Sequence, residues 1–286
     1  MAGADDCLVD RTRSTQSAEM TAGAVIMAFN TDQVDYMALA AWNSANIRRH
    51  LDIPVAVVTD DPGSHASAFD QVIVITAPET SGQRNLDGTG AVPWHNTNRM
   101  CAYELSPWDR TLLLDADLVI ASSDLRRCID SDVEIMSHRW AYDVTGRDDF
   151  ANMNWFGDFR MPQWWATVMV FERCRKCDVV FDAMRRIRDN WNHYRKIYGI
   201  NASLYRNDHA LSIALNIENG HTLTTTDIPW CLATVMPDCG LQVLDQDQYR
   251  IDYRDSENRA RYIMTQGHDL HVMAKPQLER IVASAA

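Results

Sequence analysis

The feature that most constrains this chain is an apolar segment, residues 112–120, that two aspartates interrupt. Its sequence, Leu-Leu-Leu-Asp-Ala-Asp-Leu-Val-Ile, is too short for a helix of its own and predicts a buried strand. Residues two apart on a strand face the same side, so we expect the carboxylates of Asp115 and Asp117 to point the same way. Burying two like charges together is costly unless a cation lies between them. A hard divalent cation such as Mn²⁺ or Mg²⁺ fits, because it binds carboxylate oxygens and leaves positions for phosphate oxygens.

The Asp-x-Asp pattern by itself is weak, because the chain contains two further copies of it. Asp130-Ser-Asp132 and Asp245-Gln-Asp247 lie in polar surroundings that are typical of solvated loops. Only the copy at Asp115 interrupts a strong apolar segment. A helix N-cap or a turn at the end of a strand would explain that copy about as well as a metal site.

Length and composition indicate an ordinary globular protein. The 286 residues allow one large domain, 46% of them are hydrophobic, and no apolar run is long enough to span a bilayer. The first residues of the chain are polar and lack the apolar core of a secretory signal. We therefore expect a disordered leader over residues 1–22, a single domain over residues 23–286, and a cytoplasmic protein without a transmembrane segment.

The seven cysteines, an odd number without a regular framework, favour reduced thiols in that compartment. Cys174 and Cys177 form an isolated CxxC pair. A zinc site would need two further ligands, and Cys231 and Cys239 are badly spaced for it. We interpret the pair as neither a metal site nor a redox site.

The distribution of charge bears on the choice of partner. The net charge of −12 disfavours a general nucleic-acid-binding surface. Residues 173–206, however, carry nine Lys and Arg against three Asp, a local charge of +6. The plainer interpretation of this basic segment is a solvated helix face, and the alternative is a docking surface for a polyanionic acceptor or a membrane.

Apolar runs and helical periodicity alternate along the first part of the chain. We predict strands over 24–29, 54–59, 69–75 and 112–120, and helices over 36–51 and 96–105, with a glycine-containing loop over 82–93. This order predicts an α/β fold with a mostly parallel central sheet flanked by helices. Ligands of such sheets bind beyond the carboxyl ends of the strands, where the polar groups 30–32, 60–61 and 115–117 fall.

The second part of the chain is less regular. Residues 138–165 are rich in aromatic side chains, which indicates either a hydrophobic subcore or a wall that stacks on a sugar or a base. We predict a strand over 168–171, helices over 179–198 and 208–215, and an extended edge over 223–228. A late segment, 266–276, contains two histidines and a lysine.

Together these residues resemble the glycosyltransferases of the GT-A fold, most closely family 8, the glycogenin and galactosyltransferase-like family. The resemblance is most specific from Asn98 to Asp117, where a basic residue, Arg99, starts a helix and a Trp-Asp-Arg turn leads into Leu-Asp-Ala-Asp. The interval of 16 residues from Arg99 to Asp115 is that of the family. Ala28-Phe-Asn-Thr-Asp32, with Tyr36, looks like the family's first-strand nucleotide pocket.

The resemblance implies a Rossmann-like GT-A fold and transfer of a sugar from a nucleotide sugar, UDP-linked, with retention at the anomeric carbon. It implies Mn²⁺ or Mg²⁺ as cofactor, held by Asp115, Asp117 and a late histidine. We favour His271 over His268 as that ligand, because Leu270-His-Val272 is strand-like and Gly267-His268 is turn-like. Donor-binding residues would be Phe29, Asn30, Asp32, Tyr36, Arg99, Ala116 and Lys275. Catalytic residues would be Asp208, Asn207 and Arg99.

Within this assignment, Arg99 and Lys275 would place positive charge on the diphosphate, and Asp208 would orient the sugar or stabilise its positive centre. The chain departs from the family at three places. Where the family has Asn-Ala-Gly, this chain has Trp165-Ala-Thr167, and where the family has Asp-Gln, it has Asn207-Asp-His209. The glycine of the family's late histidine motif is missing. For Asp208, a place in the cap of the following helix is the competing interpretation.

The acceptor stays open at this point. It could be a hydroxyl of a carbohydrate, of a protein, or of a hydroxylated base in nucleic acid, the last through the basic segment and the aromatic residues. Two other classes of protein remain as alternatives. A nucleotidyltransferase would carry a Gly-rich basic loop after the first strand, which Asn30-Thr-Asp-Gln-Val-Asp35 is not. An inactive carbohydrate-binding or nucleic-acid-binding module would not hydrolyse a nucleotide sugar.

Overall fold

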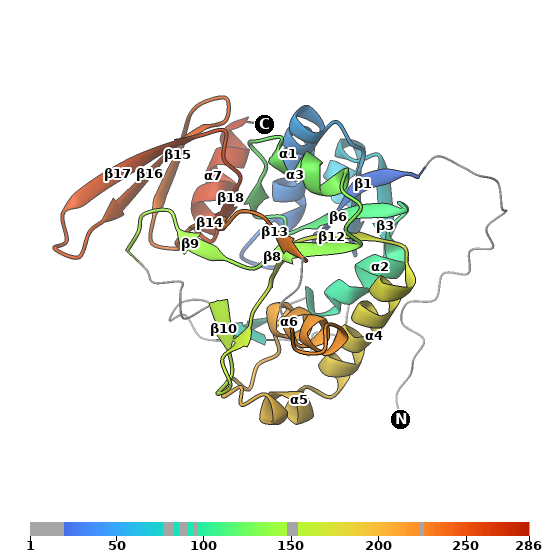
Figure 1. The fold of residues 1–286 in the computed structure, drawn as a ribbon. Helices are drawn as coiled ribbons and strands as arrows, with labels where there is room; N and C mark the ends of the chain where they lie inside the picture. Colours follow the sequence, from blue (N-terminus) through green and yellow to red (C-terminus); the bar gives the residue numbers. More distant parts are fainter. Residues whose placement is uncertain are drawn as a thin grey trace.

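A mixed seven-stranded sheet forms the centre of the molecule (Figure 1). This is a computed structural model, and it describes residues 20–76, 83–85, 91–93, 96–147, 154–222 and 226–285. The strand order is β13-β8-β12-β6-β1-β2-β3. Along the chain the strands are β1 (Ala22–Met27), β2 (Val55–Thr59), β3 (Gln71–Val74), β6 (Arg110–Leu114), β8 (Ile135–His138), β12 (Trp165–Glu172) and β13 (Asp227–Ile228).

The predicted mostly parallel sheet is confirmed. Strand β1 pairs in parallel with both β2 and β6, and β2 pairs in parallel with β3. Strand β12 is antiparallel to its two neighbours, β6 and β8. The parallel register sets Ile26 opposite Leu114, so the loops that follow β1 and β6 emerge at the same edge of the sheet.

Helices cover both faces of the sheet and enclose two cores (Figure 1). One core holds Ala24 and Ile26 of β1 together with the helices α1 (Tyr36–Leu51), α3 (Asp124–Ile129) and α7 (Lys275–Ala285). The other holds Val25 and Met27 together with α2 (Ala102–Leu105), α4 (Arg175–Asp189), α5 (Trp191–Ile197) and α6 (Asn207–Glu218). Alternate residues of β1 thus enter opposite cores, which explains why the whole strand is apolar.

Further small sheets lie beside the central one. A four-stranded sheet has the order β7-β18-β14-β9, and β15-β16-β17 forms an antiparallel sheet that extends from the body next to α7 (Figure 1). Their strands are β7 (Leu118–Val119), β9 (Ala141–Asp143), β14 (Leu232–Val235), β15 (Gly240–Asp245), β16 (Gln248–Arg254), β17 (Ala260–Gln266) and β18 (Leu270–Val272). The remaining strands form two hairpins, β4 (Gln83–Asn85) with β5 (Ala91–Pro93) and β10 (Trp155–Phe156) with β11 (Met161–Pro162).

Several predicted elements differ from those observed. The helix over 179–198 is two helices, because the backbone leaves helical geometry at Asn190, where φ is −121°. The helix over 96–105 begins with 3₁₀ turns, η2 (Asn96–Cys101), and a short 3₁₀ helix, η1 (Gly63–Ala68), follows β2. Of the loop 82–93, the structure describes residues 83–85 and 91–93, which are β4 and β5. Of the edge 223–228, it describes residues 226–228, which include β13.

The sequence also predicted a disordered leader and the absence of a transmembrane segment. Residues 1–19 of the expected leader lie outside the described residues. Within the described part of the chain, no helix combines the length and the apolar character that a membrane span needs.

Candidate metal and donor site

Asp115 and Asp117 lie in a turn that connects the central sheet to the four-stranded sheet. Strand β6 ends at Leu114, and β7 begins at Leu118 in the other sheet. The expectation that both aspartates lie on one face of a single strand is therefore wrong. The turn is fixed by two backbone hydrogen bonds, one of 3.0 Å from Asp115 N–H to the carbonyl of Thr167 and one of 3.2 Å from Leu118 N–H to the carbonyl of Asp115.

His271 reaches this turn because β18 pairs with β7. His271 lies opposite Leu118 in the antiparallel register, and Val272 N–H donates a 2.9 Å hydrogen bond to the carbonyl of Asp117. The predicted strand character of residues 270–272 is confirmed. Asp115, Asp117 and His271 form a group whose ligand atoms all lie within 4.8 Å of one another. His268 is exposed in the bend before this strand.

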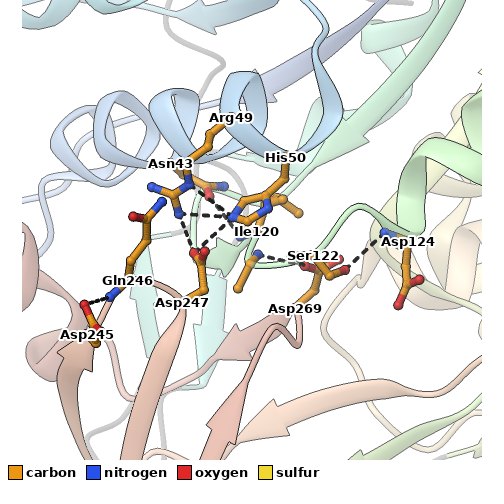
Figure 2. A network of polar contacts seen from close by, with 11 residues as sticks. Asn43, Arg49, His50, Ile120, Ser122, Asp124, Asp245, Gln246, Asp247 and Asp269 are labelled. Atoms are coloured by element: carbon orange, nitrogen blue, oxygen red, sulfur yellow. Dashed lines mark hydrogen bonds and ion pairs between the residues drawn. The ribbon is translucent and has the colours of Figure 1, made fainter.

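Polar side chains from other elements hold the two strands in place (Figure 2). The buried amide of Asn43, on α1, accepts a 3.1 Å hydrogen bond from Ile120 N–H and donates one to the carbonyl of Leu118. The Asp269 carboxylate, just before β18, accepts hydrogen bonds from the N–H groups of Ala121 and Ser122, at 2.8 and 2.9 Å. Side-chain hydrogen bonds to the backbone thus help to set the positions of β7 and β18, and hence of the metal group.

Each aspartate forms an ion pair with a buried cation. Arg99 Nη1 lies 2.7 Å from Asp115 Oδ1, and Lys275 Nζ lies 2.8 Å from Asp117 Oδ2. The Arg99 side chain is 1% exposed and also donates to the carbonyl of Thr167. Burial raises the pKa of Asp115, Arg99 opposes that shift, and the charge of Asp117 adds to it. Arg99 and Lys275, which were predicted to bind the diphosphate, therefore lie next to the aspartates. In this structure each of them pairs with one aspartate.

The donor set fits a divalent cation. Carboxylate oxygens suit Mg²⁺ and Mn²⁺, and an imidazole nitrogen among them favours a transition metal such as Mn²⁺. Lys275 contacts Oδ2 of Asp117, whereas Oδ1 is the oxygen that faces His271 Nε2, at 3.9 Å. That spacing is close to the roughly 4 Å between ligand atoms on opposite sides of a small divalent ion. The three side chains can therefore hold a metal ion.

The predicted nucleotide pocket lies in the loop after β1, at the same sheet edge as the aspartates. Phe29 is buried, and the Asn30 carboxamide oxygen accepts a 2.9 Å hydrogen bond from Met37 N–H at the start of α1. Asp32 is exposed and Tyr36 is half-buried. The methyl group of Ala116 packs in the core, so this residue offers a donor only its backbone.

Asp208 lies in the first turn of α6, and its side chain is largely buried. Its Oδ1 accepts a 2.9 Å hydrogen bond from Ala166 N–H, and its Oδ2 pairs with Arg206 at 2.9 Å. Burial would raise the pKa of Asp208, but Arg206 and the Ala166 N–H outweigh it and hold the pKa below its usual value. The N-cap residue of α6 is Arg206, so Asp208 is not that cap. Ala166, which donates to Asp208, precedes Thr167, whose carbonyl accepts the hydrogen bond from Asp115 N–H.

Asn207 differs from Asp208 in its surroundings. Its amide donates a 2.8 Å hydrogen bond to the carbonyl of Asn96 and accepts one of 3.1 Å from the Tyr205 hydroxyl. Both ends of the side chain are thus bonded within the protein. A catalytic role for Asn207 stays a prediction, and the contacts seen here are structural ones.

Sequence reasoning did not identify Arg206 or Thr167. Arg206 is the charge partner of Asp208, and the Thr167 carbonyl accepts hydrogen bonds from both Arg99 and Asp115. Arg206 lies two residues before the candidate catalytic Asp208, and this spacing could have indicated that the two side chains pair. Thr167 acts through its backbone carbonyl, so the identity of its side chain could not have indicated this role.

The structure explains two other sequence features, the CxxC pair and the basic segment. In the CxxC pair, Cys174 is the N-cap of α4, with its sulfur 3.5 Å from Cys177 N, and burial raises the pKa of the Cys177 thiol. Besides Arg206, three of the nine Lys and Arg residues of the basic segment pair with acidic side chains. Lys176 pairs with Glu134, Arg185 with Glu104 and Asp182, and Arg188 with Asp189.

No family model matches the chain, and no curated protein matches it. Among solved structures, it is similar to the galactosyltransferase LgtC in complex with donor and acceptor sugar analogs, at 13% identity over 68% of this chain and 70% of that one, with a TM-score of 0.46. It is also similar to the glycosyltransferase GlyE of Streptococcus pneumoniae TIGR4, at 14% identity over 74% of this chain and 45% of that one, with a TM-score of 0.41. These low-identity likenesses concern the fold, and the function proposed below is argued from the residues of this chain.

Proposed function

We propose that this protein is a metal-dependent glycosyltransferase of the GT-A type that uses a nucleotide sugar, UDP-linked, as donor. The observation that carries the proposal is the meeting of Asp115, Asp117 and His271 at the carboxyl end of β6, flanked by Arg99 and Lys275. A metal bound there would act as a Lewis acid on the departing diphosphate.

The charges of the site support a diphosphate ligand. In the structure, the two aspartates are balanced by Arg99 and Lys275. A divalent cation would leave the site positive, and the negative phosphates of a nucleotide sugar would restore the balance. Arg99 and Lys275 lie against the metal ligands and can turn from the carboxylates to phosphate oxygens. A site for a neutral ligand would not need this surplus of positive charge.

In the proposed reaction, a hydroxyl oxygen of the acceptor bonds to the anomeric carbon of the donor sugar. The bond from that carbon to the diphosphate breaks, its electron pair leaves with the nucleoside diphosphate, and the hydroxyl proton is lost to water. Asp208, kept ionised by Arg206, would stabilise the positive anomeric centre. Retention of configuration is taken from the family resemblance.

A panel of nucleotide sugars tests the proposal. We expect one of them to raise the unfolding temperature only when Mn²⁺ is present, because a ligand that binds the native state stabilises it by mass action. Slow hydrolysis of the same nucleotide sugar should require Mn²⁺ and should be lost in Asp115→Asn. A protein that binds no nucleotide sugar with either metal, or that hydrolyses one equally well in Asp115→Asn, would contradict it. A nucleotidyltransferase would instead be stabilised by a nucleoside triphosphate.

A further inference from the structure

A cavity of about 380 Å³ opens between the β10–β11 hairpin and the loop that connects α5 to α6. Its aromatic wall comes from Trp155, Phe156 and Trp165, and its polar wall includes Gln163 and Asn201. A volume in this range suits a small ligand. Flat rings beside amide side chains form a surface that can contact both the apolar faces and the hydroxyl groups of a sugar.

The backbone of the two loops is built to form this cavity. Gly157 and Gly199 both have positive φ angles, of 66° and 63°, and Asp158 N–H donates a 3.1 Å hydrogen bond to the carbonyl of Gly199. A Cβ on Gly157 would lie 1.9 Å from the carbonyl oxygen of Tyr198, and one on Gly199 would lie 2.7 Å from the Asp158 carboxylate. The loops can approach each other only because both positions are glycine. The cavity is therefore a consequence of a specific close contact between the loops.

The cavity adjoins the candidate catalytic carboxylate. Arg206 lines it and pairs with Asp208, and Trp165 lines it next to Ala166, whose N–H donates to the same carboxylate. His209, the residue after Asp208, also lines it, and its Nδ1 is buried without a hydrogen-bond partner in the described part of the chain. A molecule in the cavity would thus lie next to Asp208. Hydrogen bonds connect Asp208 to the metal group, because Ala166 N–H donates to Asp208 and the carbonyl of the next residue, Thr167, accepts from Asp115 N–H.

The charges around the cavity distinguish between the classes of acceptor. Among the residues that line it, Arg206 and Asp158 are the charged ones, and Arg206 is already paired with Asp208. Burial lowers the pKa of His209 to about 4, so this side chain is neutral near pH 7. No unpaired cation of the lining is left to bind a phosphate, which disfavours a nucleic-acid backbone here. The lining instead offers amides, an indole-rich wall and a carboxylate, which bind hydroxyl groups.

We propose that this cavity is the acceptor subsite and that it binds the uncharged end of a carbohydrate. The acceptor role rests on the proposed transferase function, whereas saccharide binding at the cavity does not. Trp155, Gln163 and Asn201 would hold the sugar, and Arg206 would hold Asp208 between it and the donor. Of the Lys and Arg residues of the basic segment, 173–206, only Arg206 then takes part in binding the acceptor.

Saturation-transfer NMR with maltose, cellobiose and methyl hexosides tests the binding, with a single-stranded oligonucleotide as the charged probe. We expect at least one saccharide to bind and Trp155→Ala and Asn201→Ala each to weaken it about tenfold, the effect of losing one good contact. Phe159→Ala is the matched control, because Phe159 is in the same hairpin, 68% exposed and outside the cavity lining. Thermal unfolding shows that each variant is folded. Absence of saccharide binding, equal binding by all variants, or an oligonucleotide that displaces the sugar would overturn the proposal.

The same variants separate this inference from the proposed function. With the donor identified and a bound saccharide as acceptor, the ratio of transfer to donor hydrolysis should fall about tenfold in Trp155→Ala and Asn201→Ala and stay unchanged in Phe159→Ala. An unchanged ratio in the cavity variants would overturn the acceptor role while the transferase remained. Saccharide binding at the cavity without any metal-dependent donor binding would overturn the transferase and leave the sugar site.

Discussion

Asp117 and Lys275 form an ion pair whose side chains are 7% and 6% exposed. Asp117→Asn would leave the buried Lys275 ammonium without this charge partner. We expect Asp117→Asn to lose Mn²⁺ binding and also to lower the free energy of unfolding by about 3 kcal/mol. Urea unfolding and calorimetric Mn²⁺ titration measure the two effects.

The double variant Asp117→Asn/Lys275→Met is the control. It removes both charges and should recover most of the lost stability, because a buried pair replaced by uncharged groups carries little penalty. It should not recover Mn²⁺ binding. A double variant no more stable than Asp117→Asn would show that the charge of Lys275 is not what destabilises the single variant. Asp115→Asn should cost less stability, because its partner Arg99 keeps a bond to the Thr167 carbonyl.

The two late histidines should differ sharply in their effect on the metal. His271→Ala removes a side chain from the metal group, whereas His268 is exposed in the bend before β18. Replacement of a ligand or its support typically costs 10–100-fold in metal affinity. We expect an Mn²⁺ affinity at least about tenfold weaker in His271→Ala and unchanged in His268→Ala, by calorimetry. The reverse order would transfer the ligand role to His268.

His209 should make stability depend on pH. Burial lowers its pKa in the folded protein from 6.5 to about 4, so between these values the unfolded chain binds a proton that the folded protein does not. The free energy of unfolding should therefore fall as the pH falls through this window, by up to about 1.4 kcal/mol per pH unit. The stability that the neutral form provides is fully present above the unfolded pKa.

Urea unfolding of wild type and His209→Gln between pH 7 and pH 4 measures this contribution. The variant should show the shallower slope. It should not be flat, because burial also lowers the pKa of His138 to about 4 and adds a second contribution of the same sign. Equal slopes in the two proteins would mean that His209 is protonated to the same extent in the folded and unfolded states.

Among the elements, α1 supports the candidate site through one amide. Asn43 is 1% exposed and accepts a hydrogen bond from the N–H of Ile120, the residue after β7 (Figure 2). It also donates one to the carbonyl of Leu118, the first residue of β7. Asn43→Ala leaves two buried backbone groups without partners, so we expect a loss of about 2 kcal/mol in unfolding free energy and weaker Mn²⁺ binding. Asn46→Ala, on the same buried face of α1, is the comparison. An unchanged Mn²⁺ affinity in Asn43→Ala would show that β7 keeps its place without the amide.

The sequence predicted the first elements of the central sheet more closely than the small sheets beside it, for a physical reason. Helix α1 was predicted at its observed bounds, and β1 and β2 within two residues, because each repeats a pattern over several residues. The strand predicted over 112–120 is instead β6, a turn and β7, and β7 has only two residues, too few to show a period. Residues 270–272 were recognised as strand-like, but their sequence does not indicate that they pair with β7. Asp115 and His271 could therefore be proposed as partners by resemblance, but not the sheet that brings them together.

The cavity could not be predicted from the sequence either. Its walls come from 155–165 and 199–209, two segments that showed no shared pattern. The residues that bring them together are Gly157 and Gly199, and a single glycine does not reveal which backbone it will approach. The aromatic residues of 138–165 were recognised, with a subcore and a ligand wall as alternatives. Trp164 is buried, as the first alternative expects, whereas Trp155 lines the cavity, where the second alternative stays a prediction.

At the scale of the whole molecule, the pairing of the basic segment bears on nucleic-acid binding. Lys176, Arg185 and Arg188 pair with acidic side chains, and the net charge is −12. We expect single-stranded DNA to bind weakly and to make few phosphate contacts. The slope of log Kd against log salt should then be shallow, because each phosphate contact contributes only about 0.7 to it for a single strand. Fluorescence anisotropy over a salt series measures it.

The variant Arg185→Ala/Arg186→Ala/Arg188→Ala provides the comparison. If paired side chains are not used for binding, its salt slope should match that of wild type. A steep wild-type slope that flattens in this variant would show that the basic segment binds DNA after all. Because Arg185 also bridges α4 to Glu104 of α2, the unfolding temperature of the variant should be measured alongside.

The turn at Asp115 and Asp117 has a consequence for hydrogen exchange. Asp115 follows the last strand residue of the central sheet, whereas His271 belongs to the four-stranded sheet, so a bound ion would join the two sheets directly. Coupling of this kind is reciprocal. A bound ion makes the two sheets harder to separate, and a change that makes the sheets easier to separate weakens binding of the ion. Amide protons of β14 and β18 should exchange more slowly with deuterium when the ion is present. Exchange at these strands would then report metal binding without a substrate.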